Sequence, residues 1–173
     1  MRDPITNMRV KLLHPKLRKE VEQLIDKAEA GFPSTIAIRI VQGLRTFEEQ
    51  DKLYAQGRTL RGNRVTNSRG GQSYHNYGLA IDFALLYDKD ANGTWETLSW
   101  DVAKDFDKDG LADWMEVVNI FEEAGYTWGG RFSSIPDAPH FEKNFGLNWR
   151  ELFKRYNAKE FISEGKYVII DHI

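Results

Sequence analysis

A histidine and an aspartate that could share a metal ion lie seven residues apart, at His75 and Asp82. From Leu79 onward the pattern predicts a strand, whose successive side chains point to opposite faces. Asp82 would leave this strand between Ala80 and Ala84, which leave space beside it. A carboxylate there is costly unless a cation meets it, and a metal ion shared with His75 would meet it. The alternative is an aspartate in a salt bridge at a strand end, with a surface histidine nearby.

A third candidate ligand, His140, lies far along the chain in a short predicted strand that puts it on the same face as Glu142. The chain has four histidines and no cysteine, so a transition metal would have to use histidines and carboxylates. Two histidines and one carboxylate, with an open fourth position, suit a catalytic zinc ion. Such a site needs a base near its water, which Asp137 could supply, and an oxyanion donor, which Arg45 could supply. Spacing alone does not show that these residues meet, because they come from distant segments.

Residues 105–116 match the loop of an EF-hand, the helix–loop–helix calcium site. Acidic side chains occupy positions 1, 3, 5, 9 and 12, glycine occupies position 6, and position 7 offers a backbone carbonyl. The predicted calcium ligands are Asp105, Asp107, Asp109, Leu111 (through its carbonyl), Asp113 and Glu116. The alternative is a loop of Asx turns that caps the next helix. A similar turn at residues 88–93 has Ser99 at position 12, so it is the weaker match.

Arg45 follows a predicted strand and precedes a helix, at a junction whose loop residues tend to face clefts. A surface arginine paired with Glu48 or Glu49 is the alternative, and it is preferred until something places Arg45 near the metal. Residues 56–72 contain four arginines and no acid, so this loop is a candidate for binding an anionic substrate. A solvated basic loop is the alternative there.

The surrounding pattern predicts elements that would position these residues. Helices are expected over residues 15–30, 46–55, 113–124 and 148–156, and strands over residues 35–41, 79–86, 126–128, 139–142 and 166–171. The second helix begins with the capping-box pattern of Thr46 and Glu49, and His14 is expected at the start of the first. Separated helices and short strands indicate an α+β fold with a small, mainly antiparallel sheet flanked by helices.

The composition limits the possible functions. The 173 residues include 24 basic and 26 acidic side chains, and a net charge of −2 argues against general nucleic-acid binding. The N-terminus has no apolar signal-peptide core, and no apolar run could cross a membrane. We expect a monomer with one domain over residues 1–173.

Two motifs together resemble a known enzyme family. Ser73-x-His75-x-x-Gly78-x-Ala80-x-Asp82, followed by Asp137-x-Pro139-His140, resembles the signature of D-alanyl-D-alanine carboxypeptidases and VanY-type zinc peptidases, which share a fold core with hedgehog domains. The closer resemblance is to L-alanyl-D-glutamate endopeptidases of bacterial cell-wall turnover and phage endolysins. It rests on Arg45 with Glu49-Gln50, on residues 53–59 and 70–78, and on Trp128-Gly129-Gly130. It covers roughly residues 13–145. The resemblance implies one zinc peptidase catalytic domain over residues 1–173, with residues 145–173 packed on it and no separate wall-binding domain.

The resemblance implies roles for individual residues. His75, Asp82 and His140 would bind zinc, Asp137 would be the general base and then the acid, Arg45 would stabilise the oxyanion or bind substrate, and Ser73 would support the ligands. The implied enzyme is a bacteriolytic zinc metallopeptidase that hydrolyses the peptidoglycan stem peptide, with the L-Ala–D-Glu bond favoured. The alternatives are a D,D- or L,D-carboxypeptidase on the same peptides and a non-catalytic, hedgehog-like metal-binding module. Asp137 argues against the module, because a structural site needs no base.

The resemblance also suggests where the protein would act. Without an export signal of its own, the chain is expected to be made in the cytoplasm and to act on the bacterial cell wall, as an endolysin or a wall-remodelling enzyme. A phage lysin would need holin-type release.

Overall fold

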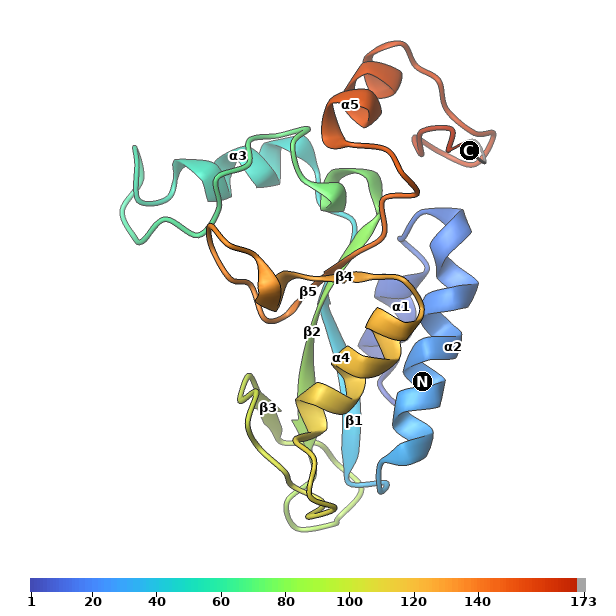
Figure 1. Ribbon diagram of the computed structural model, residues 1–173, viewed down its shortest axis with the longest axis vertical. Coiled ribbons are helices and arrows are strands. Elements are labelled where there is room, and N and C mark those ends of the chain that lie inside the picture. Colours follow the sequence, from blue (N-terminus) through green and yellow to red (C-terminus); the bar gives the residue numbers. More distant parts are fainter. Residues whose placement is uncertain (171–173) are drawn as a thin grey trace.

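The computed structural model describes residues 1–170 of the chain. Helices and strands follow one another as α1 (Pro4–Val10), α2 (Pro15–Gly31), β1 (Ile36–Gln42), α3 (Phe47–Ala55), η1 (Tyr74–Tyr77), β2 (Ala80–Tyr87), β3 (Thr97–Ser99), α4 (Asp113–Glu123), β4 (Thr127–Trp128), η2 (Gly129–Arg131), β5 (His140–Glu142) and α5 (Trp149–Asn157) (Figure 1). The predicted α+β class is confirmed. No helix within residues 1–170 has both the length and the apolarity needed to cross a membrane.

Strand β2 is the centre of an antiparallel sheet with the order β1-β2-β5-β4. From Asp82 to Tyr87 it pairs with β1 on one side. On the other side its first residues pair with β5 and its last residues pair with β3. The short strand β5 therefore lies beside the start of β2, where Asp82 is located, and Asp82 pairs directly with His140.

The main core lies between one face of this sheet and helices α2 and α4, which lie side by side (Figure 1). On β2 this face carries the buried side chains Leu79, Ile81, Phe83, Leu85 and Tyr87, as the alternating pattern predicts. Trp114 of α4 packs on Phe83, with ring centroids 4.2 Å apart. Asp82 points to the opposite face and is free of this apolar layer.

Local capping sets the start of two helices. His14 is the N-cap of α2 and accepts a hydrogen bond from the Lys16 amide, which confirms its predicted place at the helix entry. Thr46 and Glu49 form the predicted capping box at the start of α3. Arg45, one residue before this cap, is thereby held in the loop that joins β1 to α3.

Helix α1 was not expected from the sequence, and it covers the free edge of β1. The Thr6 hydroxyl donates to the Ile38 carbonyl and accepts from the Ile40 amide. Asp3 caps the helix and forms an ion pair with Arg39 of β1. These contacts satisfy strand groups that would otherwise remain unpaired at a sheet edge.

The strand predicted over residues 166–171 is wrong for its described part, residues 166–170, and Asp171 lies outside the described residues. Only an isolated bridge between Phe161 and Val168 forms there. Val168 is buried, but its carbonyl accepts a hydrogen bond from the His14 ring. The Ile169 carbonyl similarly accepts from Arg155. Side chains thus satisfy these two carbonyls, while the Ile169 amide donates to the Glu160 carbonyl beside the bridge. Leu147, Leu152, Val168 and Ile170 join the core.

Candidate metal centre

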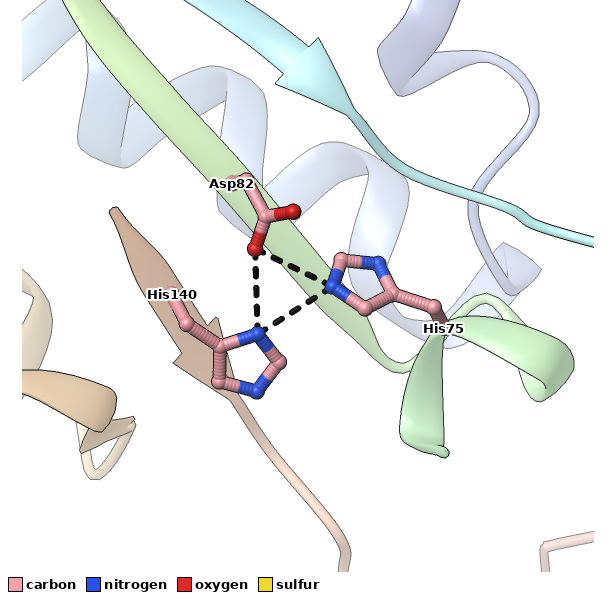
Figure 2. Close-up of side chains that lie close together, drawn as sticks. All are labelled: His75, Asp82 and His140. Carbon is pink, nitrogen blue, oxygen red and sulfur yellow. Dashed lines mark hydrogen bonds and ion pairs between the residues drawn. The ribbon is translucent and has the colours of Figure 1, made fainter. Parts of the chain in front are cut away.

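Three ligand-type side chains meet at one point, which we call the metal centre: His75, Asp82 and His140 (Figure 2). Asp82 and His140 are direct neighbours across β2 and β5, and His75 comes from η1, just before β2. The Asp82 Oδ1 atom lies 3.1 Å from His75 Nε2 and 3.0 Å from His140 Nδ1. The two ring nitrogens are 3.1 Å apart. The fold thus brings together three residues, and their spacing in the sequence could not show that they meet.

The ring nitrogens that point away from the metal centre also have partners. His75 Nδ1 lies 2.8 Å from the Gly43 carbonyl oxygen. His140 Nε2 lies 3.0 Å from Glu142 Oε2, two residues along the same strand. Such partners fix the orientation of a histidine and leave its other nitrogen free for a metal. The donor set of two imidazole nitrogens and one carboxylate oxygen fits a transition metal such as zinc.

The charges around the metal centre favour a cation. Burial raises the pKa of Asp82, but His75 and His140 together lower it by more. The resulting pKa lies below the usual range. Burial lowers the pKa of His140, but hydrogen bonds to Asp82 and Glu142 raise it to about 9. The Asp82 shift comes from the two histidines and the His140 shift comes from the two carboxylates, so each reflects attraction between opposite charges in a nearly closed space. A bound metal cation would supply such an opposite charge beside Asp82.

Asp137 lies beside the metal centre but is not one of its three residues. Asp137 lines a cavity that His75, Asp82 and His140 also line. Within residues 1–170 no hydrogen bond holds its carboxylate. Burial and the neighbouring charge of Asp82 raise its pKa. Its loop is fixed instead through the backbone, because the Asp137 amide donates to the Gly129 carbonyl. A Cβ at Gly129 would lie 2.6 Å from the Asp137 carbonyl oxygen, so this close approach needs glycine.

Arg45 faces the metal centre. Its Nη2 atom lies 3.4 Å from Asp82 Oδ2, and its Nη1 atom donates to Gln50 Oε1 at 2.9 Å. Pairing with Glu48 or Glu49, the preferred alternative from sequence, is wrong: the Glu49 carboxylate accepts from the Thr46 amide in the capping box. Burial lowers the pKa of Arg45, but a guanidinium remains protonated at neutral pH.

Two amide side chains hold this arrangement together, and sequence reasoning gave neither of them a role. Gln50 is fully buried, accepts from Arg45 and donates to the Ser68 carbonyl. Asn76 donates to the Arg45 and Thr46 carbonyls and accepts from the Gly71 amide. The resemblance included Gln50 only as part of a motif, and nothing local in the sequence marks either residue as a link between loops.

The metal centre opens into a cavity of about 480 Å³, here called the catalytic cavity. Ser73 and Tyr74 line it next to His75. Residues 65–68 of the basic loop and residues 132–135 of the β4–β5 connection form further parts of its wall. This volume is within the range of pockets that bind small ligands.

Residues 105–116, the acidic loop, lie at the end of the molecule away from α3 and α5 (Figure 1). The structure gathers carboxylates there in two overlapping groups, Asp105 with Asp107 and Asp113, and Asp107 with Asp109 and Glu116. The Asp113 carboxylate accepts from the Tyr87 hydroxyl at 2.7 Å, which ties the loop to the end of β2. Glu116 Oε2 is buried without a hydrogen-bond partner among the described residues.

The catalytic part of the chain matches known peptidases. A family described as D-alanyl-D-alanine carboxypeptidase matches residues 66–143, which include His75, Asp82, Asp137 and His140 but not Arg45. The peptidoglycan L-alanyl-D-glutamate endopeptidase CwlK of Bacillus subtilis (strain 168) is 47% identical over 130 residues, 75% of this chain and 72% of that protein.

A solved structure shares the fold. The crystal structure of the L-Ala D-Glu endopeptidase ChiX from Serratia marcescens matches with a TM-score of 0.51 and 22% identity. The match covers 82% of this chain and 88% of that one.

Proposed function

Because this chain belongs to the D-alanyl-D-alanine carboxypeptidase family of peptidases, we propose that it is a zinc enzyme that hydrolyses the L-Ala–D-Glu bond of the peptidoglycan stem peptide. The observation that carries the proposal is the meeting of His75 Nε2, His140 Nδ1 and Asp82 Oδ1 at the floor of a cavity. The choice of bond is supported by the 47% identity to CwlK, whose name specifies it.

Zinc would be held by the three side chains of the metal centre, with Gly43 and Glu142 orienting the two imidazole rings. When bound, the ion supplies a Lewis acid that polarises the scissile carbonyl and lowers the pKa of a coordinated water. His75→Ala and His140→Ala are each expected to lose zinc in elemental analysis. Full zinc occupancy in both variants would contradict this ligand set.

Asp137 and Arg45 would serve the proton transfers and the developing charge. Asp137 accepts a proton from the attacking water and returns it to the leaving amine. This role is supported by its raised pKa and by a carboxylate that has no hydrogen bond among residues 1–170. Arg45 donates hydrogen bonds toward the oxygen that gains negative charge, or toward a substrate carboxylate. Ser73 would help to shape the cavity wall beside His75.

We further propose that the acidic loop binds calcium through Asp105, Asp107, Asp109, the Leu111 carbonyl, Asp113 and Glu116. Burial and repulsion from four aspartates raise the pKa of Glu116 to about 7. A divalent cation would relieve this repulsion and give the buried Glu116 Oε2 atom a partner.

The bond specificity is tested by digesting purified peptidoglycan and determining the fragment masses. Cleavage at L-Ala–D-Glu leaves peptides that begin with D-Glu, whereas a D,D- or L,D-carboxypeptidase releases single amino acids from the C-terminal end. Release of single residues without new D-Glu amino ends would contradict the proposed endopeptidase. The same digestion of whole bacterial walls tests the proposed action as an endolysin or wall-remodelling enzyme.

A further inference from the structure

A second cavity lies beside the catalytic cavity. It has a volume of about 450 Å³ and shares Arg45 and Leu53 with the catalytic cavity. Helix α3 provides Lys52 and the basic loop provides Leu60 and Arg61 as further lining residues. A substrate extending from the metal centre past Arg45 would enter a space lined by two leucines and by two more cations.

The basic loop uses its four arginines in different ways. Arg58 donates to the Tyr54 and Thr66 carbonyls and stacks on the Tyr54 ring, and Arg69 lies over the same ring. These two arginines hold the loop in place. Arg61 lines the second cavity, and Arg64 lines neither cavity.

Lys52 and Arg61 are both exposed, and within residues 1–170 neither side chain has a hydrogen bond or ion pair. Glu49 is an acidic residue in the same wall, and its carboxylate is engaged by the Thr46 amide. The second cavity therefore keeps a net positive charge, because Arg45, Lys52 and Arg61 outnumber the single Glu49 carboxylate. An anionic group fits this arrangement, and leucine side chains suit an aliphatic stem that carries it.

We propose that the second cavity is a subsite in which Lys52 and Arg61 bind a carboxylate of the stem peptide. This inference rests on the proposed function and adds a specificity determinant to it. Glutamate within a peptide retains one carboxylate after forming its chain linkage, and the peptide ends in another. A peptide bound across the metal centre would thus carry negative charge into the neighbouring cavity.

The test uses synthetic stem peptides that contain the L-Ala–D-Glu bond, with carboxylates either free or amidated. For the Lys52→Gln/Arg61→Gln double variant we expect KM for the free-acid peptide to rise about three- to tenfold, the effect of losing exposed ion pairs. We expect kcat to be unchanged and the amidated peptide to be cleaved as by the wild type. Arg64→Gln is the matched control, and it should leave both KM values unchanged.

An equal loss on both peptides, or no change in KM, would overturn the subsite. Zinc content and melting temperature exclude loss of fold in the double variant. Calorimetric binding of a product peptide that begins with D-Glu separates this inference from the proposed reaction, because it needs no cleavage. Weaker binding of its free-acid form to the double variant supports the subsite whichever bond is cut, and equal binding contradicts it.

Discussion

Asp137 differs from Asp82 in what surrounds its carboxylate. Asp82 is held between two histidines, whereas the Asp137 carboxylate faces the catalytic cavity without a hydrogen bond in the described chain. Asp137→Asn should therefore keep zinc and fold while turnover on purified wall falls by about 10²–10⁴-fold, the usual contribution of general acid–base catalysis. The measurement is kcat with zinc content determined in parallel. A variant with near-normal turnover would remove Asp137 from the mechanism.

Glu142 is the partner of the His140 nitrogen that points away from the metal centre. Losing such a partner typically weakens metal affinity by about 10- to 100-fold, because the ring is no longer fixed or polarised. Glu142→Ala is expected to show a loss of this size in zinc competition against a chelator. Glu142→Gln can still accept the hydrogen bond, so it should recover part of the affinity. Equal affinities for the wild type and both variants would show that Glu142 does not position His140.

Asp3 connects α1, the helix that the sequence did not predict, to the edge strand β1. Burial raises its pKa, but hydrogen bonds from Arg39 and Thr6 lower it below the model-compound value of 3.8. Stability from a depressed acid pKa is complete above 3.8 and is lost as pH falls through the folded-state pKa. Asp3→Asn keeps an N-cap but loses the ion pair, so we expect it to cost about 1–3 kcal/mol at pH 7.

The pH dependence of this cost can be measured directly. Urea unfolding of wild type and Asp3→Asn at pH 7 and at pH 3 should show the difference shrinking at the lower pH, because pH 3 lies below the unfolded-state pKa and closer to the lowered folded-state pKa. Asp3→Ala should cost about 1 kcal/mol more than Asp3→Asn, through the lost cap. A difference that stays constant with pH would mean that the Arg39 ion pair does not stabilise the fold.

Elements were predictable where the signal was local. Thr46 and Glu49 formed the capping box that their spacing predicts, and the alternating residues of β2 placed Asp82 on the face opposite the core. Helix α1 was missed because it depends on contacts between Thr6 and β1, 32 residues away for Ile38. The roles of Gln50 and Asn76 were missed for the same reason, since each links segments that are distant in sequence.

The wrong prediction of a strand at residues 166–170 arose where a local pattern was present but the expected strand pairing was not. Val168 and Ile170 have the alternating apolar pattern of a strand, and both are buried. However, the backbone of this segment pairs only at the isolated bridge to Phe161, and side chains such as His14 satisfy other backbone groups. Burial was thus predictable from the pattern, but strand pairing was not.

Over the whole molecule, α4 connects the acidic loop to the metal centre. Asp113, at the start of α4, accepts from Tyr87 at the end of β2, and Trp114 packs on Phe83, which follows Asp82. A cation that orders the loop would therefore fix both a helix and the strand that carries a proposed zinc ligand. The five acidic side chains of the loop repel one another when no cation is present, as the raised pKa of Glu116 indicates.

Calcium is accordingly expected to stabilise the protein and to support turnover. At 100 times its dissociation constant, a ligand of the native state adds about 2.7 kcal/mol, or about 5–10 °C in melting temperature for a chain of this size. Melting and wall digestion should be followed with a chelator that spares zinc and again after calcium is restored. Glu116→Gln should lose most of the shift, whereas Asp90→Asn, in the weaker acidic turn, is the matched control. An unchanged melting temperature in the wild type would contradict calcium binding, and a shift in melting without a change in rate would contradict only its support of catalysis.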